Sequence, residues 1–374
     1  MIQLRRSLHQ YPEVAFDLPR TLALVRTELD KAGIPYTDKY GKSSLVASIN
    51  DQMRDQGSLA LRADMDALDL KENSTTSYRS MIEGHMHACG HDAHTAILLG
   101  VIRALSKNRH AVPCRVVFIF QAAEEAGGAT HMAGDGIAGE FDRIAGCHVF
   151  NELEAGSIAI HRGTAFAACR TFSLTFSGKA VHAATPEKGI DAIRMGVEAY
   201  NQIEQLTQPN SLDCDPFILR VCTIEGGQQT NLIAERCTLK GTIRAGSDTT
   251  MYWLSQHLDH LSAAVAAKAQ GIYALNLSGV CPAVVNDNHL VDSLYTAAQK
   301  TGAQVQIRHQ PLMLSEDFSI LKGNKPGVFF LLGTGNQKQG LTAPLHSASF
   351  DIDERALLTG ARTLIQFICD QSGS

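Results

Sequence analysis

Residues Arg115–Glu125 read RVVFIFQAAEE. Arg115–Phe120 is an almost unbroken run of β-branched and aromatic residues, which is typical of a strand buried on both faces of a sheet. Glu124 and Glu125 follow at the carboxyl end of this strand, where α/β sheets place their active sites. Adjacent carboxylates are costly to desolvate, so they form either a solvated acidic turn or a pair of one metal ligand and one general base. The spacing alone does not say which glutamate has which role.

Strand and helix patterns alternate on both sides of this strand. The helical spacing of Thr21–Ala32 ends at Gly33, a natural C-cap. Further helices are expected at Ala93–Ser106 and from Leu290 onward, and further strands at Ser44–Ile49, Leu59–Arg62, Arg143–Val149, Ser157–His161 and Gly327–Leu332. This alternation predicts an α/β fold with a sheet covered by helices.

The pattern changes after about Cys169. The expected order is strand, helix, strand, strand, helix, strand, at Arg170–Ser177, Gly189–Leu206, Phe217–Glu225, Cys237–Ala245, Thr249–Lys268 and Tyr273–Ser278. This order is that of a ferredoxin-like α+β module. We therefore expect an inserted domain at 169–279 that divides the catalytic domain into 1–168 and 280–374.

The composition excludes several functional classes. Among 374 residues, 33 are basic and 38 acidic, which gives a net charge of −5 without a basic run, so no nucleic-acid partner is expected. The apolar runs are too short to span a membrane, and Met1–Gln10 lacks the apolar stretch of a secretory signal. The nine cysteines include no Cys-x-x-Cys pair, so we expect a reduced, cytoplasmic protein.

The segment Met81–Gly100, MIEGHMHACGHDAHTAILLG, is unusually rich in metal-ligand side chains. Residues two apart in extended backbone point the same way, so Cys89 and His91 could share one metal centre. Asp92 stands before an apolar run and is expected to cap a helix. The alternative is a polar loop with surface histidines and a capped helix.

Three further motifs stand at or near expected strand ends or close to the carboxyl terminus. They are Gly146-Cys147-His148, Leu345-His346-Ser347 and Asp64-Met65-Asp66. Taken singly, each histidine could be structural, and the aspartates could form a turn, orient a ligand histidine or bind a metal. Their shared position at strand ends favours an active site.

With these motifs, the chain resembles the dinuclear metal-dependent amidohydrolases of the aminoacylase/carboxypeptidase group. The branch it resembles includes hippurate hydrolases, indole-acetyl-amino-acid hydrolases and N-acetyldiaminopimelate deacetylases. The resemblance extends over nearly the whole chain, and its most specific string is MHACGHDAH. The matching residues are Leu8–Asp17, Leu61–Leu68, Met86–Ala96, Gln121–Glu125, Gly146–His148, Val181–Pro186, Asn231, Gly241–Arg244, Ser315–Phe318 and Leu345–Ser347.

The resemblance implies a three-layer α/β/α metallopeptidase catalytic domain with an inserted ferredoxin-like dimerisation, or lid, domain. It also implies two divalent metal ions per chain, zinc or manganese first and cobalt or nickel next. Glu124 would be the general base, and Cys89 would bridge the metals as a thiolate. The implied metal ligands are Cys89, His91, Glu125, His148 and His346.

The inserted module would supply further groups. By resemblance, His182 is catalytic and reaches across a homodimer, while Asn231 and Arg244 bind substrate. The implied reaction is hydrolysis of the amide bond of N-acyl-L-amino acids by a metal-activated water. The alternatives are a dipeptidase or carboxypeptidase, an N-acetyldiaminopimelate deacetylase, or a non-catalytic metal-binding homologue. A structural zinc site would not need the paired glutamates, which argues against the last.

The chain departs from the family pattern beside the expected site. Asp69 and Ala122 stand where the family has prolines, which loosens two loops and affects substrate preference more than chemistry. Asp64 and Asp66 stand where sister branches have a His-x-Asp metal motif, and we expect them to contact the ligands rather than the metals. His87 and His94 are expected to make local hydrogen bonds.

Overall fold

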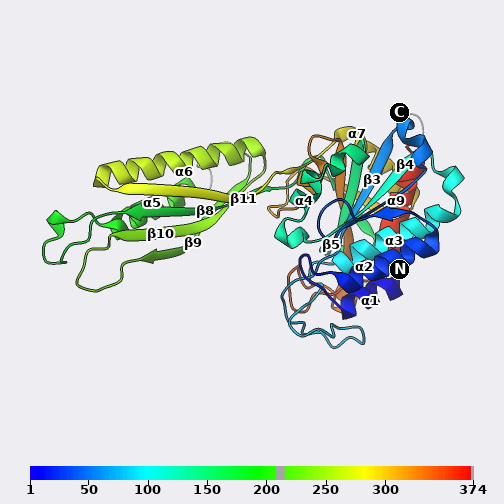
Figure 1. Ribbon diagram of the computed structural model, residues 1–374, viewed down its shortest axis with the longest axis horizontal. Coiled ribbons are helices and arrows are strands. Elements are labelled where there is room, and N and C mark those ends of the chain that lie inside the picture. Colours follow the sequence, from blue (N-terminus) through cyan, green and yellow to red (C-terminus); the bar gives the residue numbers. More distant parts are fainter. Residues whose placement is uncertain (208–214, 372–374) are drawn as a thin grey trace. The chain divides into compact units, whose positions relative to one another are not determined.

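The computed structural model describes residues 1–207 and 215–371. The chain divides into two compact units (Figure 1). The larger contains Met1–Ala165, Val285–Gln310 and Asp317–Ser374, and the smaller contains Phe166–Val284 and Pro311–Glu316. None of the helices in the described residues is both long and apolar enough to cross a bilayer.

The larger unit is built on an eight-stranded mixed sheet in the order β1-β2-β4-β3-β5-β14-β6-β13. The neighbouring strands β4, β3, β5 and β14 run parallel to one another, which confirms the α/β fold predicted from the sequence. The strands are β1 (Tyr36–Thr37), β2 (Leu45–Ile49), β3 (Ser58–Asp64), β4 (Arg115–Gln121), β5 (Arg143–Glu154), β6 (Ser157–His161), β13 (Gln304–Arg308) and β14 (Gly327–Gly335).

Helices cover both faces of this sheet. They are α1 (Ile2–Gln10), α2 (Pro19–Ala32), α3 (His91–Lys107), α4 (Ala129–Gly134), α7 (Asn288–Lys300), α8 (Phe318–Lys322) and α9 (Ala356–Cys369). α3 packs against α1, α2 and α9, and α9 also packs against α7. On β5, Ala145 belongs to the core that includes α3, whereas Gly146 faces Phe318 of α8 on the other side. Every residue of β3, β4 and β14 is buried, because helices lie on both faces.

Two helix termini test the sequence predictions. α2 ends as expected, because Gly33 adopts a φ of 62° and its N–H bonds to the last turn. α3 begins at His91 rather than at Ala93, and its N-cap is Gly90, with a φ of 83°. The predicted N-cap role of Asp92 is therefore wrong. Asp92 lies inside the first turn, where its carboxylate forms an ion pair with Arg5 at 2.8 Å.

The smaller unit has the predicted order of strand, helix, strand, strand, helix, strand. Its antiparallel sheet runs β11-β8-β10-β9, the order of a ferredoxin-like fold. Its elements are β8 (Ala168–Ser177), α5 (Ala192–Leu206), β9 (Phe217–Gly226), β10 (Arg236–Ala245), α6 (Asp248–Ala269) and β11 (Ile272–Cys281). Strands β7 (Gly163–Phe166) and β12 (Val284–Asn286) form a separate two-stranded sheet.

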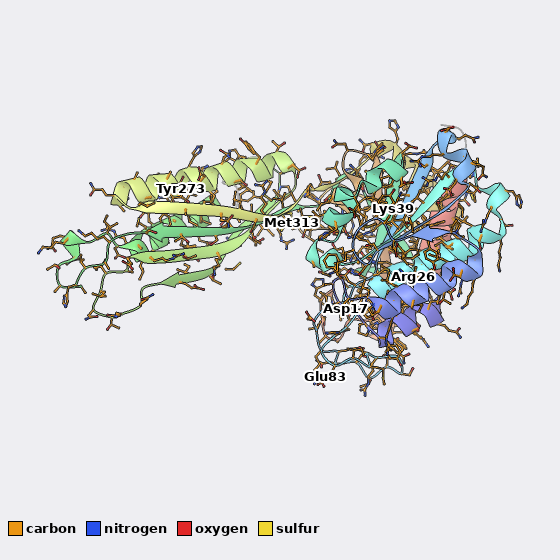
Figure 2. The ribbon with its side chains drawn as sticks, in the orientation of Figure 1. Asp17, Arg26, Lys39, Glu83, Tyr273 and Met313 are labelled. Atoms are coloured by element: carbon orange, nitrogen blue, oxygen red, sulfur yellow. The ribbon has the colours of Figure 1, made fainter. Side chains whose placement is uncertain are left out.

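A short segment returns to the smaller unit from the C-terminal part of the chain. The backbone N–H of Ala167 lies 2.9 Å from the carbonyl oxygens of both Leu312 and Leu314. Nearby, Arg244 donates a hydrogen bond to the carbonyl of Met313, at 3.0 Å, and Met313 is labelled in Figure 2. No pattern in the sequence indicates that Pro311–Glu316 belongs to this unit.

Candidate active site

The candidate active site lies at the carboxyl ends of three parallel strands of the larger unit. Asp64 is the last residue of β3 and Gln121 is the last residue of β4. His148 is the sixth of the twelve residues of β5, two residues beyond the point where the pairing of β5 with β3 ends. Since these strands run parallel, their carboxyl ends meet at one edge of the sheet. The first turn of α3, which carries His91, contributes to the same cluster.

Cys89 is at the centre of this cluster. Its Sγ atom lies 3.3 Å from Nε2 of His148 and 3.3 Å from Nε2 of His346. Nε2 of His346 is also 3.2 Å from Oε1 of Glu125. The four side chains come from four separate segments of the chain, so the fold brings together residues that are far apart in the sequence.

The ligand atoms of this cluster form sets that could each hold a metal ion. In each set, the nitrogen, sulfur or carboxylate oxygen atoms lie within 4.8 Å of one another. Cys89 belongs to two of these sets, as a thiolate that bridges two ions would. The sets that include Cys89, His91 or both are Cys89–His91–His148, Cys89–Glu125–His346, His91–Glu124–Glu125 and Asp64–His91–His94.

His91 supports the fit of this cluster to metal ions. Its side chain is buried, and its ring nitrogens lie 3.4 Å from Asp66 and 3.7 Å from Asp64 without making a hydrogen bond within the described residues. Buried nitrogens that lack a well-formed hydrogen bond are costly, and a metal ion would satisfy one of them. Burial lowers the pKa of His148 to about 3, with His94 contributing, so His148 is held as the neutral imidazole that binds metals.

Cys89 would change its protonation state on binding a metal. Burial raises the pKa of the Cys89 thiol well above its ordinary value, although His91 acts in the opposite direction. A divalent ion deprotonates a coordinating thiol, so metal binding at this residue releases a proton.

Asp64 and Asp66 contact the cluster, as expected from the sequence. Burial opposes ionisation of Asp64, but His91, His94 and Arg62 outweigh it and hold its pKa well below the ordinary value. Nδ1 of His91 lies 3.4 Å from Asp66, whose carboxylate also accepts the backbone N–H groups of Glu124, at 2.9 Å, and Glu125, at 3.2 Å. Asp66 therefore holds the turn that carries both glutamates.

The two histidines for which local hydrogen bonds were expected behave differently. His94 contacts Asp64 at 2.6 Å and the backbone N–H of Val149 at 2.9 Å, which confirms the expectation. For His87 the expectation is wrong, because neither of its buried ring nitrogens has a hydrogen-bond partner in the described part of the chain. Burial lowers its pKa to about 3, so the ring is neutral.

The predicted residues of the inserted module do not lie together within one chain. His182 and Asn231 are adjacent, because the N–H of Ala183 donates to the carbonyl of Asn231 at 2.9 Å. Their segments join the module at the Arg236 end of β10, where Gly178 bonds to Glu235. Arg244 lies eight residues further along β10, which corresponds to about 26 Å at the rise of a strand.

Sequence reasoning assigned no role to two buried arginines near the site. Arg5 is fully buried and pairs with Asp92, at 2.8 Å, and with Asp351, at 2.9 Å. Arg62 pairs with Asp64, at 2.7 Å, and with Asp317, at 3.0 Å. Arg62 falls within the matching segment Leu61–Leu68, which was the only signal available for it.

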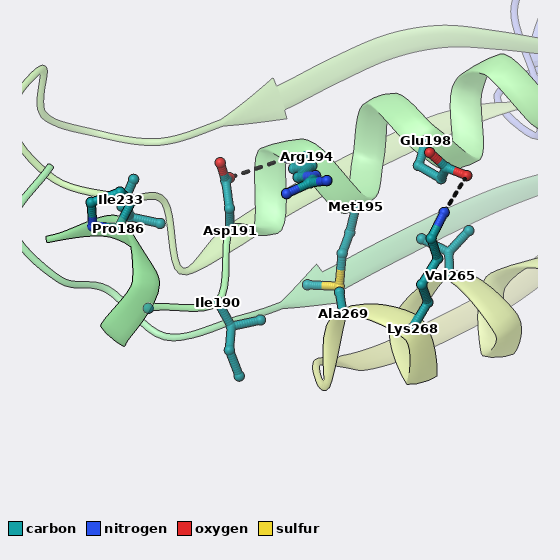
Figure 3. Close-up of a pocket in the computed structure, with 11 residues that line it drawn as sticks. Pro186, Ile190, Asp191, Arg194, Met195, Glu198, Ile233, Val265, Lys268 and Ala269 are labelled. Atoms are coloured by element: carbon teal, nitrogen blue, oxygen red, sulfur yellow. Dashed lines mark hydrogen bonds and ion pairs between the residues drawn. The ribbon is translucent and has the colours of Figure 1, made fainter.

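A surface pocket of about 310 Å³ lies in the smaller unit, between the first turns of α5 and the end of α6 (Figure 3). It contains none of the predicted site residues. In its lining, Asp191 accepts the backbone N–H of Arg194, and Glu198 pairs with Lys268 at 3.4 Å. None of the candidate metal-ligand sets in the described residues lines this pocket.

Comparisons with known proteins agree with the geometry. Residues 60–370 match the model of peptidase family M20/M25/M40. The chain is 34% identical over 370 residues to an IAA-amino acid hydrolase of Arabidopsis thaliana, covering 96% of this chain and 83% of that protein. It is 32% identical over 369 residues to thermostable carboxypeptidase 1 of Saccharolobus solfataricus, covering 96% and 92%.

A solved structure is also similar. The crystal structure of a dinuclear metal-binding peptidase of the M20 family from Bacillus subtilis has a TM-score of 0.87 and 26% identity, covering 98% of this chain and 96% of that one. The match extends through both units of the fold and through the segments that carry the cysteine, histidine and glutamate cluster. The chain thus belongs to peptidase family M20/M25/M40 and is a hydrolase that acts on amide bonds.

Proposed function

We propose that the protein hydrolyses the amide bond of N-acyl-L-amino acids, using two divalent metal ions. The observation that carries the proposal is the position of Cys89, 3.3 Å from both His148 and His346. The proposed metal ligands are Cys89, His91, Glu125, His148 and His346. A thiolate favours zinc, and manganese, cobalt and nickel are compatible with the imidazole and carboxylate ligands.

When bound, the two ions would polarise the amide carbonyl and make a water molecule acidic enough to lose its proton. Glu124 is proposed as the general base that accepts this proton and later gives it to the leaving amine. Its neighbour Glu125 is proposed as a ligand, because its carboxylate lies 3.2 Å from His346. The two adjacent glutamates would then have separate roles. Asp66 would hold the turn that carries both of them, because it accepts both of their backbone N–H groups.

The proposed substrate follows from the inserted module. Arg244 can hold a carboxylate with two parallel hydrogen bonds, and Asn231 can donate a further one. His182 is proposed to stabilise the oxyanion of the tetrahedral intermediate. The similarity to an IAA-amino acid hydrolase supports an acylated amino acid as the substrate. The similarity to a carboxypeptidase keeps a dipeptidase or carboxypeptidase activity as the second candidate, and N-acetyldiaminopimelate deacetylation is a third.

A homodimer would bring His182 of one chain to the active site of its partner. Strand β9 is an edge of its sheet and is exposed at most positions, and an unpaired edge strand can pair with a second copy. Beside it, Ile193 and Val197 on α5 are 41% and 48% exposed, and Ile224 on β9 is 48% exposed. We propose that this apolar edge is the dimer interface and that His182 acts in the partner's site.

We propose a cytoplasmic protein, because none of the eight described cysteines forms a disulfide.

The test of the function is an activity panel of N-acetyl and N-benzoyl amino acids and unmodified dipeptides. The purified protein is assayed after chelation and after reconstitution with zinc, manganese, cobalt or nickel. We expect two ions per chain by elemental analysis and metal-dependent release of the amino acid from acylated substrates. The Cys89→Ala variant should lose the bridge and the activity. A fully metallated, fully active Cys89→Ala protein would contradict the proposed centre.

A further inference from the structure

Asp317 belongs to the matching segment Ser315–Phe318 but has no role in the proposed mechanism. It lies just before α8 and is 5% exposed. Its carboxylate accepts hydrogen bonds from Nη2 of Arg62 at 3.0 Å, Nε2 of Gln121 at 2.8 Å and the backbone N–H of Ala129 at 2.9 Å. A buried carboxylate with this many donors is held in one position.

The donors enclose the turn that carries the two glutamates. Gln121 is the last residue of β4, before the turn, and Ala129 is the first residue of α4, after it. Between them, Oε1 of Glu124 accepts the backbone N–H of Asp317 at 3.4 Å. One residue therefore contacts the start of the turn, its end and the side chain of the proposed base.

We propose that Asp317 is a positioning residue for Glu124, an inference that rests on the proposed role of Glu124 as general base. The carboxylate of Asp317 fixes the turn, and its backbone N–H orients the carboxylate of Glu124. Arg62 connects this arrangement to the metal cluster, because it also donates to Asp64 at 2.7 Å.

The first test needs no substrate. In the Asp317→Asn variant, the side-chain amide presents N–H groups to a site that already contains three donors, so at least one contact is lost. Hydrogen–deuterium exchange of peptides that cover residues 122–129 should become faster. Asp353→Asn is the matched control, because Asp353 is also a buried carboxylate but pairs with Arg355 and Asn336 instead of with this turn. Unchanged exchange of the turn in Asp317→Asn would overturn the proposal.

The second test is a double-mutant cycle on the best substrate of the acyl-amino acid panel. Asp317→Asn should lower kcat about 10- to 100-fold while KM and metal content stay within about twofold. In the Glu124→Gln background the same substitution should have little further effect, because Asp317 acts through Glu124. Equal losses in both backgrounds, or loss of metal, would overturn the proposal. Full turnover by Glu124→Gln alone would instead refute the proposed base.

A second variant covers the case in which Asp317→Asn does not fold. Gln121→Met removes the two 2.8 Å hydrogen bonds to Asp317 and the 2.9 Å bond that Gln121 accepts from Nε of Arg62, and it leaves the charge of Asp317 paired with Nη2 of Arg62. We expect a smaller decrease in kcat, the same lack of additivity with Glu124→Gln and faster exchange of the turn. A fully active Gln121→Met protein with unchanged exchange would contradict the positioning role.

Cys169 and Cys281, in the smaller unit, carry an independent inference. They are Cα partners across the antiparallel strands β8 and β11, just after an irregularity in the register between Ser278 and Cys281, and both are half-buried. Opposed residues on regular antiparallel strands have Cα atoms about 4.5–5.5 Å apart, within the range that a disulfide requires. The chain enters the smaller unit just before β8 and leaves it just after β11. A disulfide between Cys169 and Cys281 would therefore link the segment that enters the unit to the segment that leaves it.

We infer that Cys169 and Cys281 form a reversible disulfide when a small-molecule disulfide is available as oxidant. One thiolate attacks the oxidant and releases one small thiol, leaving a mixed disulfide. The second cysteine then attacks the mixed disulfide and releases the other small thiol, so two protein thiols and one disulfide become one protein disulfide and two small thiols.

The experiment is treatment with oxidised glutathione, alkylation and peptide mass spectrometry. We expect a cross-linked peptide that contains Cys169 and Cys281, which dithiothreitol reverses and Cys169→Ser abolishes. Cys369, an exposed cysteine at the end of α9 and outside the proposed dimer interface, is the internal control for the oxidant, because it should form a mixed disulfide. If Cys369 is modified while Cys169 and Cys281 are both alkylated, or while one carries only glutathione, the inference is wrong.

Discussion

His94 connects the end of strand β3 to strand β5 through Asp64. Nε2 of His94 accepts the backbone N–H of Val149 at 2.9 Å, so Nδ1 carries the proton that it donates to Asp64 at 2.6 Å. This tautomer fixes the position of the backbone immediately after His148. Asp64 thus orients His94 beside Cys89, His91 and His148, as carboxylates orient histidines next to many metal sites.

The roles of the adjacent residues Glu124 and Glu125 should be distinguishable when each is replaced by glutamine. Glu124→Gln is expected to keep two ions per chain but lose roughly 10²–10⁴ in kcat, the usual scale for a general base. Glu125→Gln should lose metal, because the Glu125 carboxylate lies 3.2 Å from His346, another proposed ligand. Elemental analysis and steady-state kinetics check both variants. The opposite pattern of metal loss would show that the two roles are exchanged.

A shared active site should allow rescue between inactive variants. His182→Ala and Glu124→Gln chains are each expected to be inactive. Hybrid dimers regain one complete site out of two, so an equal mixture should recover about a quarter of the wild-type activity. The measurement is activity after subunit exchange followed by native mass spectrometry. No recovery despite demonstrated hybrid dimers, or a monomeric protein, would argue against a site built from two chains.

Arg244 should bind the free carboxylate of the substrate. Masking that carboxylate as an amide leaves a desolvated guanidinium unpaired, so kcat/KM should decrease by at least about 10². Arg244→Ala should lose activity on the free acid and nearly erase the preference between the two substrates. Arg236→Ala, at the other end of β10, is the matched control and should keep that preference. Equal cleavage of masked and free substrates by the wild type would refute this role.

His161 should make the fold less stable in acid. Burial lowers its pKa to about 4, with Arg308 contributing, and neither ring nitrogen has a hydrogen-bond partner in the described residues. Its pKa in the unfolded chain is about 6.5, so below that pH the unfolded state binds a proton that the folded state does not. Stability is therefore lost as the pH falls from about 6.5 to about 4, by about 2–3 kcal/mol at pH 4.5.

Urea unfolding at pH 7 and pH 4.5 measures this loss. His161→Leu should reduce the difference in unfolding free energy between the two pH values, whereas His309→Leu, at an exposed histidine, should not. If wild type and His161→Leu show the same difference, His161 is not responsible.

The sequence predicted the features that depend on local patterns. The run at Arg115–Phe120 is the buried strand β4, and Gly33 ends α2 because only short-range geometry is involved. The order of strands and helices in the inserted module could also be predicted, since Arg170–Ser177 alternates in polarity and α5 is amphipathic.

The sequence did not predict features that depend on distant partners. Arg5 lies in a helix with the charge pattern of a surface helix, yet it is fully buried against Asp92 and Asp351. Hydropathy cannot show that a charge is buried when its partners are far away in the chain. For the same reason, spacing could not distinguish the roles of Glu124 and Glu125. The 3.2 Å contact between Glu125 and His346 supports the proposed ligand role of Glu125, although both glutamates share a candidate metal set with His91.

The return of Pro311–Glu316 to the smaller unit affects how this protein can be engineered. A graft that exchanges only residues 166–284 would separate Ala167 and Arg244 from their hydrogen-bond acceptors at Leu312, Met313 and Leu314. A chimaera that borrows the module from a relative must therefore take two pieces of that relative's chain. Recombination at a single pair of crossover points would place Pro311–Glu316 of one parent against the module of the other parent in every hybrid.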